Sequence, residues 1–221
     1  MSCYEKYKYP EPVPIENRQW PDRVITKAPT WTSVDLRDGN QALPIPMNPE
    51  QKLAYFKLLV KIGFKEIEVG FPSASKDDFD FVRRLIEEKH IPDDVTISVL
   101  TQARKHLIDK TAESLRGVKS GIIHCYVATS DLHGRFVFNF DRNKVREMAI
   151  SGTKMTVEAI AANGLTGIVG YEFSPEEFTY SNLDFVVDLC DTVTDTWNPK
   201  AGEKVIVNLP ATVERNLPTH Y

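Results

Sequence analysis

The sequence is poor in cysteine, and its few cysteines stand far apart. Cys3, Cys125 and Cys190 form no CxxC motif, and their number is odd. Such cysteines fit reduced thiols in a cytosol better than a disulfide framework. We therefore predict that each cysteine is a packing residue rather than a nucleophile and that the protein is cytoplasmic.

Long apolar runs are also missing, as is any excess of basic residues. No stretch approaches the length needed to span a membrane. The 27 Lys and Arg against 31 Asp and Glu leave a net charge of −4, and the basic residues are scattered. No zinc-finger or RNP pattern occurs. We expect neither a membrane nor nucleic acid as a partner, so any attraction for an anionic substrate must be local.

The beginning of the chain lacks the apolar segment of a signal peptide, and Glu5, Glu11 and Glu16 argue against a transit peptide. Its content of Pro, Tyr and Lys suits an extended segment packed on the domain or on a partner. The 221 residues, 42% of them hydrophobic, suffice for one domain with a substantial core. We predict an extended N-terminal arm over residues 1–29 and a domain over residues 30–221.

Strand-like and helix-like patterns alternate along this domain. The first helix illustrates the signals: Asn48 is a plausible N-cap, Pro49 occupies the first helical position and Gly63 ends the pattern. Strands are predicted at residues 32–36, 65–72, 95–101, 121–130, 167–174 and 203–212. Helices are predicted at residues 49–63, 77–90, 103–117, 142–164 and 182–197. Such alternation indicates a parallel sheet covered by helices.

Two architectures fit this alternation, a doubly wound sheet and a (β/α)8 TIM barrel. A doubly wound nucleotide-binding domain carries a glycine-rich turn after its first strand. Here that turn is RDGNQALPIP, and neither GxGxxG nor GKS or GKT occurs. Polar residues gather instead after several strands, as in barrels. We predict an α/β fold that is a partial (β/α)8 TIM barrel, with about six of eight βα units present.

The polar groups at the strand ends have structural as well as functional interpretations. Arg37 and Asp38 before Gly39 could form a surface turn. A carboxylate inside an apolar strand, Glu68, needs a cation or a metal, so an ion pair and a site are equally good explanations. A single histidine within a strand, such as His124, is more often a satisfied core residue.

The later strands leave the same choice open. Ser174, Pro175 and Glu176 could begin a helix as its N-cap and first turn, and Thr212 could cap another helix. The coincidence of five strands ending in ionisable or polar groups favours a site. Arg, Asp, Glu and His together can hold a divalent metal, stabilise an oxyanion and move protons. Such a set suits carbon–carbon bond formation or cleavage beside a carbonyl group.

Five motifs in the chain resemble one family of enzymes. They are VDLRDGNQAL, EIEVGFPSAS, VLTQAR, YEFSPE and NLPATVE. Together they resemble the 2-isopropylmalate synthases of the longer, fungal- and actinobacterial-like type, over about Trp20 to Tyr221. The resemblance implies a pyruvate carboxyltransferase-like barrel that condenses acetyl-CoA with 2-oxoisovalerate and water, giving 2-isopropylmalate and CoA in leucine biosynthesis. It also implies a divalent metal, either Mg, Mn or Zn, and a homodimer for the complete protein.

Roles follow from the resemblance, residue by residue. Asp38 corresponds to a metal ligand, and Arg37 to the group that stabilises the developing oxyanion. Glu68 corresponds to the conserved Glu of the superfamily on its second strand, and Glu176 to a residue close to the reacting acetyl group. These three, Arg37, Glu68 and Glu176, are the predicted catalytic residues.

The resemblance also assigns the pocket for the 2-oxo acid, which His124, Ser174 and Thr212 would line. One part of the family pattern is missing, because its remaining metal ligands form an HxH motif on the seventh strand and no HxH occurs here. We therefore expect the isolated chain to lack synthase activity. Two alternatives remain: a citramalate or homocitrate synthase of the same superfamily, and a non-catalytic truncated fragment.

Overall fold

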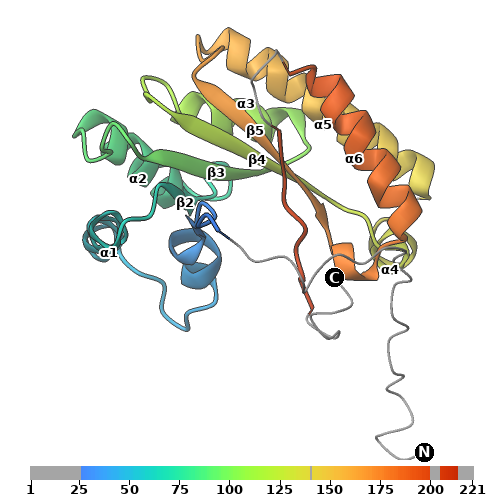
Figure 1. Cartoon of the computed structure of the whole chain (residues 1–221), viewed down its shortest axis with the longest axis horizontal. Coiled ribbons are helices and arrows are strands. Elements are labelled where there is room, and N and C mark those ends of the chain that lie inside the picture. The colour runs from blue at the N-terminus through green and yellow to red at the C-terminus, as the bar shows by residue number, and fades with distance from the viewer. Residues whose placement is uncertain (1–25, 140, 200–204, 214–221) are drawn as a thin grey trace, which may run out of the picture.

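A computed structural model of the chain describes residues 26–139, 141–199 and 205–213. Within these ranges six parallel strands form one sheet, in the order of the chain (Figure 1). They are β1 (Thr32–Ser33), β2 (Glu66–Gly70), β3 (Thr96–Gln102), β4 (Gly121–Ala128), β5 (Val169–Glu176) and β6 (Val205–Val207). Because each strand pairs with the next one in sequence, the topology is that of a barrel and not of a doubly wound sheet.

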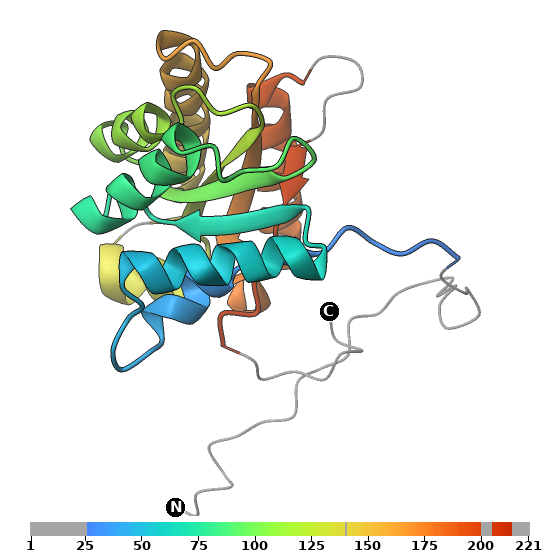
Figure 2. The same cartoon turned by 90° about the vertical axis from the view of Figure 1, so that its left-hand side faces the viewer.

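Helices connect the strands and cover one face of the sheet. The long ones are α1 (Pro49–Ile62), α2 (Lys76–Glu87), α3 (Lys105–Ser114), α5 (Arg142–Ala162) and α6 (Leu183–Trp197). A short helix α4 (Asp131–His133) continues into the π-helical turn η2 (Gly134–Phe138). Figures 1 and 2 show the sheet curling away from these helices, so that its other face is concave. The predicted partial TIM barrel is confirmed.

Alternation along the strands separates the core from the concave face. On β4 and β5, Ile123, Cys125, Tyr171 and Phe173 are buried in the hydrophobic core beneath the helices. The residues between them point to the concave face, because successive side chains of a strand point to opposite sides. Those intervening positions carry the polar groups, including His124, and so the same pattern that builds the core also places the site.

The first helix begins and ends as the sequence predicts. The side chain of Asn48 accepts a hydrogen bond from the backbone N–H of Gln51, and the Gln51 side chain accepts one from the backbone of Asn48. This capping box, with Pro49 after it, satisfies N–H groups that the first turn leaves free. Gly63 ends the helix at φ 112°, a conformation that costs glycine little.

The prediction for the first strand is wrong beyond Ser33. Residues Asp35–Gly39 form a π-helical turn, η1, instead of extended chain. The N–H groups of Arg37, Asp38 and Gly39 all donate to the carbonyl of Val34, over 3.2, 2.9 and 3.3 Å. Leu36 within the turn is completely buried, whereas Val34 before it is 43% exposed.

The prediction that Ser174 could cap a helix is also wrong. Ser174 and Glu176 belong to β5, which pairs with β4 up to the contact between Ala128 and Glu176. The next long helix begins later, with Asn182 as its N-cap. Most of the predicted arm over residues 1–29 lies outside the described residues. None of the helices in the described ranges is long and apolar enough to cross a membrane.

Close packing between α5 and the end of β3 gives a test of the fold. A Cβ atom at Gly152 would lie 2.6 Å from the Cβ and 3.3 Å from the Cα of Ala103. Alanine normally stabilises a helix by about 1 kcal/mol relative to glycine, whereas overpacking costs about 1–3 kcal/mol. We predict that Gly152→Ala lowers the free energy of unfolding by up to about 2 kcal/mol, measured by urea denaturation.

The matched control is Ser151→Ala on the exposed side of the same helix. It changes helix propensity without adding an atom to the contact with Ala103, so we expect it to leave the stability almost unchanged. A Gly152→Ala protein that unfolds at a higher urea concentration than the wild type would contradict the close approach.

Candidate functional site

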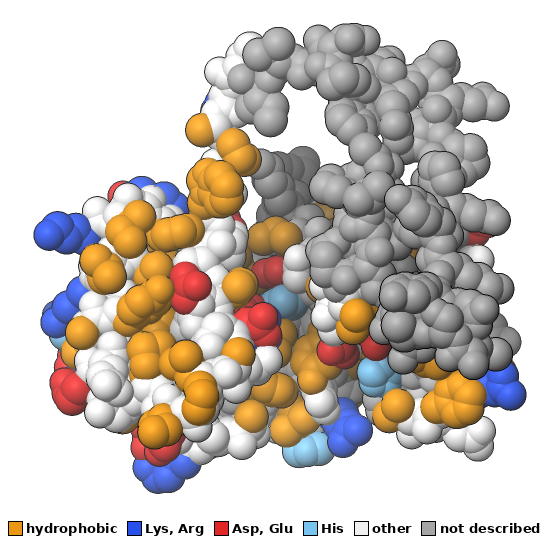
Figure 3. All heavy atoms as spheres, turned by 90° about the horizontal axis from the view of Figure 1, so that it is seen from below, with side chains coloured by type: hydrophobic (Ala, Val, Ile, Leu, Met, Phe, Trp, Pro, Cys, Tyr) orange, Lys and Arg blue, Asp and Glu red, His pale blue; other side chains and the backbone are white. Residues whose placement is uncertain are grey.

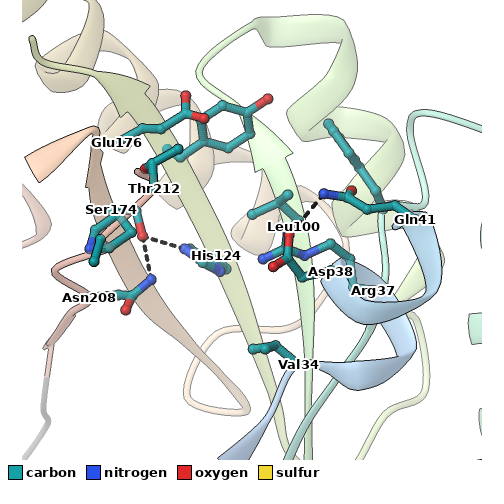
Figure 4. A pocket seen from close by; sticks show the side chains of 14 residues that line it. Val34, Arg37, Asp38, Gln41, Leu100, His124, Ser174, Glu176, Asn208 and Thr212 are labelled. Carbon is teal, nitrogen blue, oxygen red and sulfur yellow. Dashed lines mark hydrogen bonds and ion pairs between the residues drawn. The ribbon is translucent and has the colours of Figure 1, made fainter. Parts of the chain in front are cut away.

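A cavity of about 630 Å³ opens on the concave face at the carboxyl ends of the strands. Its polar lining comes from the turn after β1 and from the later strands: η1 supplies Arg37 and Asp38, β4 supplies His124, and β5 supplies Ser174 and Glu176 (Figure 4). The remaining lining residues are Val34, Gln41, Phe71, Leu100, Tyr126, Asn208, Pro210, Ala211 and Thr212. The carboxyl ends of the strands are where barrel enzymes hold their active sites.

A buried carboxylate, Glu68, organises one side of this cavity. One of its oxygens accepts a hydrogen bond from Nε of Arg37, and the other lies 2.5 Å from Nδ1 of His124. The side chain of Glu68 is only 2% exposed, and that of Arg37 is 15% exposed. Burying a carboxylate requires such partners, so Glu68 fixes the directions of both Arg37 and His124.

The hydrogen bonds continue from His124 across the cavity. Nε2 of His124 lies 2.6 Å from Oγ of Ser174, and Ser174 Oγ accepts a hydrogen bond from Nδ2 of Asn208 over 2.8 Å (Figure 4). Because an ionised carboxylate only accepts hydrogen bonds, Nδ1 of His124 is the donor to Glu68, and Nε2 is left to face the Ser174 hydroxyl. This series of hydrogen bonds thus links β2, β4, β5 and the residue after β6, and it holds each polar side chain in one direction.

Three of the carboxylates on the concave face, Glu68, Glu172 and Glu176, differ in their tendency to ionise. Burial opposes ionisation of Glu68, but the hydrogen bonds and charges of His124 and Arg37 outweigh it and hold the pKa of Glu68 below its ordinary value. Burial raises the pKa of Glu172, whose nearest cationic partner, His124, lies 3.7 Å away. Burial also raises the pKa of Glu176. The same face of the sheet therefore carries one carboxyl whose pKa is lowered and two whose pKa is raised.

The wall around Glu176 is formed by an aromatic residue and by the loop after β6. The hydroxyl of Tyr126 accepts a hydrogen bond from Nε2 of Gln102 over 2.8 Å, and burial raises its pKa. Oγ1 of Thr212 accepts a hydrogen bond from the backbone N–H of Glu177 over 3.1 Å. Thr212 therefore joins the loop after β6 to the end of β5; the residues that a helix capped by Thr212 would comprise lie outside the described ranges.

The structure brings the predicted residues together. Six of them line the cavity, namely Arg37, Asp38, His124, Ser174, Glu176 and Thr212. Glu68 lies directly behind them, in contact with two of the six. The interpretation of Glu68 as the partner in an ion pair is confirmed by its contact with Arg37, and its functional role stays a prediction.

Sequence reasoning missed the apolar part of the lining, above all Leu100 and Tyr126. The signal that could have found them is the two-residue period of the strands. Leu100 pairs with His124, and Tyr126 lies two positions after His124 on β4, so all three point to the same face.

The described residues do not complete a metal site. Asp38 Oδ1 accepts hydrogen bonds from Nη1 of Arg37 over 2.7 Å and from Nε2 of Gln41 over 2.8 Å. In the described ranges no group of three His, Cys, Asp or Glu side chains is arranged to hold a metal ion. Asp38, 55% exposed at the mouth of the cavity, can supply one oxygen ligand but no more.

The cysteines of the described ranges are inert. Cys125 is buried in the core, and burial raises the pKa of its thiol to about 12. Burial likewise raises the pKa of the Cys190 thiol to about 11. Thiols with such pKa values carry almost no thiolate at neutral pH, which agrees with their predicted role in packing.

The parallel half-barrel with a polar cavity at its strand ends defines the class, a barrel domain built like those of TIM-barrel enzymes. The chain belongs to the HMGL-like family, whose profile matches residues 28–221. A curated 2-isopropylmalate synthase of Clostridium acetobutylicum is 52% identical over 220 residues, which is 99% of this chain and 39% of the relative. Another, of Arthrobacter sp. (strain FB24), is 54% identical over 95% of this chain and 36% of the relative.

A third, of Azotobacter vinelandii, is 50% identical over 98% of this chain and 39% of the relative. This chain thus spans well under half the length of the curated relatives it matches. Among solved structures, the apo form of a 3-keto-D-glucoside 4-epimerase from E. coli is 14% identical, with a TM-score of 0.37, over 73% of this chain and 88% of the other. That likeness is too weak to inform on the function.

Because Glu68 contacts both Arg37 and His124, we predict that replacing it has a large effect on stability. Glu68→Ala leaves the buried guanidinium of Arg37 without its main partner, and loss of one member of a buried ion pair costs about 3–5 kcal/mol. We predict a loss of this size in urea denaturation at pH 7. The control is Lys119→Ala, which breaks an ion pair with Asp93 whose side chains are 75% and 84% exposed, and which we expect to change little.

The same ion pair predicts a pH dependence. The folded-state pKa of Glu68 lies below its ordinary value, so its stabilising effect is present above the unfolded-state pKa of roughly 4.3. It is lost as the pH falls through that value towards the lower folded-state pKa. The free energy of unfolding should therefore fall less between pH 7 and pH 3 in Glu68→Ala than in the wild type. An equal fall in the two proteins would contradict the lowered pKa of Glu68.

Proposed function

We propose that this chain forms the first six βα units of the catalytic barrel of a 2-isopropylmalate synthase, within a domain over residues 30–221. The proposal rests on one combination: a cavity that sets Arg37 and Asp38 opposite His124 and Ser174, in a chain about 50% identical to synthases of that name. The reaction joins acetyl-CoA, 2-oxoisovalerate and water and yields 2-isopropylmalate and CoA.

Arg37 is proposed to stabilise the oxygen that becomes negative. Its Nε and Nη1 donate to Glu68 and Asp38, which leaves three of its five N–H groups for a substrate. When the acetyl carbon attacks C2 of the 2-oxo acid, the electron pair of the carbonyl moves to its oxygen and forms an alkoxide. N–H donors that are held in advance stabilise such an oxyanion without reorganising.

Glu176 is proposed as the catalytic base. Its raised pKa matches the task of taking a proton from the acetyl methyl group, which makes that carbon nucleophilic. The alkoxide then takes up a proton, and water cleaves the thioester to release CoA. His124, Ser174 and Thr212 are proposed to bind the 2-oxo acid.

Asp38 is proposed as one ligand of a divalent metal, Mg, Mn or Zn. A metal there would polarise the carbonyl and carboxylate of the 2-oxo acid. The other ligands would have to come from outside the described residues, since these complete no metal site. We propose the cytoplasm as the compartment, where the thiols stay reduced.

The lining favours a branched apolar substrate over an acidic one. Among the lining residues Arg37 is the only Lys or Arg, and two carboxylates already contact it. Among the described lining residues, the second carboxylate of 2-oxoglutarate would find no cation other than Arg37, which argues against a homocitrate synthase. Val34, Phe71 and Leu100 can contact an isopropyl group. Pyruvate, the substrate of a citramalate synthase, would leave part of that apolar lining without contact.

Exposed apolar side chains on both flanks of the sheet indicate that more protein packs here. Leu58 and Ile62 of α1 are 47% and 63% exposed, and Ile45 before α1 is 85% exposed. Figure 3 shows hydrophobic side chains gathered on the side where Figure 1 places α1. On the opposite flank, Leu209 and Val213 after β6 are about half exposed. We propose that further βα units of the complete protein cover these flanks and that it is a homodimer.

The substrate assay is the first test. We predict that the protein expressed from the complete reading frame containing these residues releases CoA from acetyl-CoA with 2-oxoisovalerate, faster than with pyruvate or 2-oxoglutarate. Free thiol is measured with a chromogenic disulfide. The isolated 221-residue chain is expected to show no turnover, because Asp38 alone cannot hold the metal. Turnover with none of the three 2-oxo acids would refute the proposal.

Asp38 can be tested against a neighbour in the same turn. We predict that Asp38→Asn lowers kcat by about 100-fold or more and weakens metal binding, because the amide is a poorer metal ligand. Asp35→Asn is the matched control, since Asp35 also lies in η1 and is exposed but does not line the cavity. Equal losses in the two variants would show that the turn as a whole, and not the Asp38 carboxylate, matters.

The pH profile tests the role of Glu176. A base must be ionised, and burial raises the pKa of Glu176, so kcat/KM should fall as the pH drops through that raised value. We expect Glu176→Gln to remove this acid limb and to lower kcat by about 100-fold or more. A profile with the same acid limb in Glu176→Gln would assign the proton transfer to another group.

A further inference from the structure

The residue after the proposed base has an unusual backbone conformation. Glu177 lies at φ 60° and ψ 34°, in the left-handed region that residues with a Cβ rarely adopt. In the described ranges, the other three such non-glycine residues, Lys89, Asn139 and Asn198, all follow the end of a helical segment. Glu177 instead follows directly on strand β5. Strain at such a place persists only where the surrounding contacts enforce it.

The side chain of Glu177 is enclosed by the loop after β4. Its Oε2 accepts a hydrogen bond from Oγ of Ser130 and lies 2.6 Å from Nδ1 of His133. The Glu177 side chain is only 13% exposed. Because both partners contact the same oxygen, they fix the carboxylate in one position and hold the residue in its strained conformation.

Backbone hydrogen bonds fix the same turn from two other directions. The carbonyl of Glu176 accepts hydrogen bonds from the N–H and the hydroxyl of Thr129, over 3.0 and 3.1 Å. The N–H of Glu177 donates to Oγ1 of Thr212, and the Glu177 carbonyl accepts from the N–H of Tyr180 over 2.9 Å. The loops after β4, β5 and β6 therefore meet at Glu177.

We propose that Glu177 is a positioning residue for the condensation: its carboxylate, held by Ser130 and His133, keeps the left-handed turn that points Glu176 into the cavity and joins Thr212 to β5. This inference rests on the proposed function. The link to Thr212 has a chemical consequence. A hydroxyl oxygen that accepts the Glu177 N–H still has its own proton to donate to a substrate oxygen. The turn thus sets both the base and a donor for the 2-oxo acid.

Three variants in the complete protein separate the side-chain contact from the backbone conformation. Glu177→Gln keeps an oxygen that can accept from Ser130 and His133, so we expect kcat within about threefold of wild type. Glu177→Ala loses both contacts and retains the steric penalty, and misplacement of a reacting group can cost up to about 100-fold, so we expect kcat to fall about 10- to 100-fold. Glu177→Gly adopts the turn without strain, so its kcat should lie between the two.

A double-mutant comparison shows whether Glu177 acts through Glu176. In a Glu176→Gln background, Glu177→Ala should lower kcat by less than about threefold further, since the group that it positions is already gone. The KM for 2-oxoisovalerate should still rise in that background through Thr212. Melting temperatures of all variants are measured alongside, and Glu177→Gly supplies the comparison if Glu177→Ala does not fold.

The outcomes separate the inference from the function on which it rests. An active wild type in which Glu177→Ala retains full kcat, or loses the same factor with and without Glu176, would overturn the positioning role alone. If the wild type does not condense acetyl-CoA with any of the three 2-oxo acids, the proposed function and the inference are both overturned. Two results together would support the positioning role of Glu177. First, kcat should decrease in the order Glu177→Gln, Glu177→Gly, Glu177→Ala. Second, the loss of kcat caused by Glu177→Ala should be smaller in the Glu176→Gln background.

Discussion

The buried carboxylate of Glu68 is the interaction on which the rest of the site depends. An ionised carboxyl that is only 2% exposed is tolerable because a guanidinium and an imidazole meet it from opposite sides. Through Arg37 it fixes the turn after β1, and through His124 it fixes the hydroxyl of Ser174. The hydrogen bonds run without a break from Asp38, which follows the edge strand β1, to Asn208, which follows the opposite edge strand β6. A change at Glu68 therefore reaches both ends of the cavity.

This constraint also accounts for the irregular start of the sheet. β1 pairs with β2 over only two residues, and the π-helical turn begins at once. The turn brings the guanidinium of Arg37 back over Glu68 while Asp38 stays at the mouth of the cavity, 55% exposed. Two adjacent residues of opposite charge can thus face different surroundings, one a buried carboxylate and the other open space.

Local sequence patterns predicted what depends on period and capping, and missed what depends on pairing between distant segments. The two-residue alternation placed Glu68 and His124 inside strands, and the Asn48 and Gly63 signals marked a helix correctly. Ser174 in a Ser-Pro-Glu sequence has the local signature of a helix start, but pairing with β4 extends the strand through it. The local sequence did not predict the turn after Ser33 either, and the turn brings Arg37 to a partner, Glu68, that lies 31 residues away in the sequence.

Glu68, Glu172 and Glu176, three of the carboxylates on the concave face, show how one strand pattern yields different chemistry. Each sits on the concave face, and burial alone would raise the pKa of all of them. Only Glu68 has two donors within hydrogen-bond distance, and so only its pKa falls. Glu172 and Glu176 lack a comparably close cation and hold a proton more tightly. Separate pKa values in one cavity are what a site needs if one carboxylate is to orient partners and another is to move a proton. The distinction arises from partners that the fold supplies, not from the residue type.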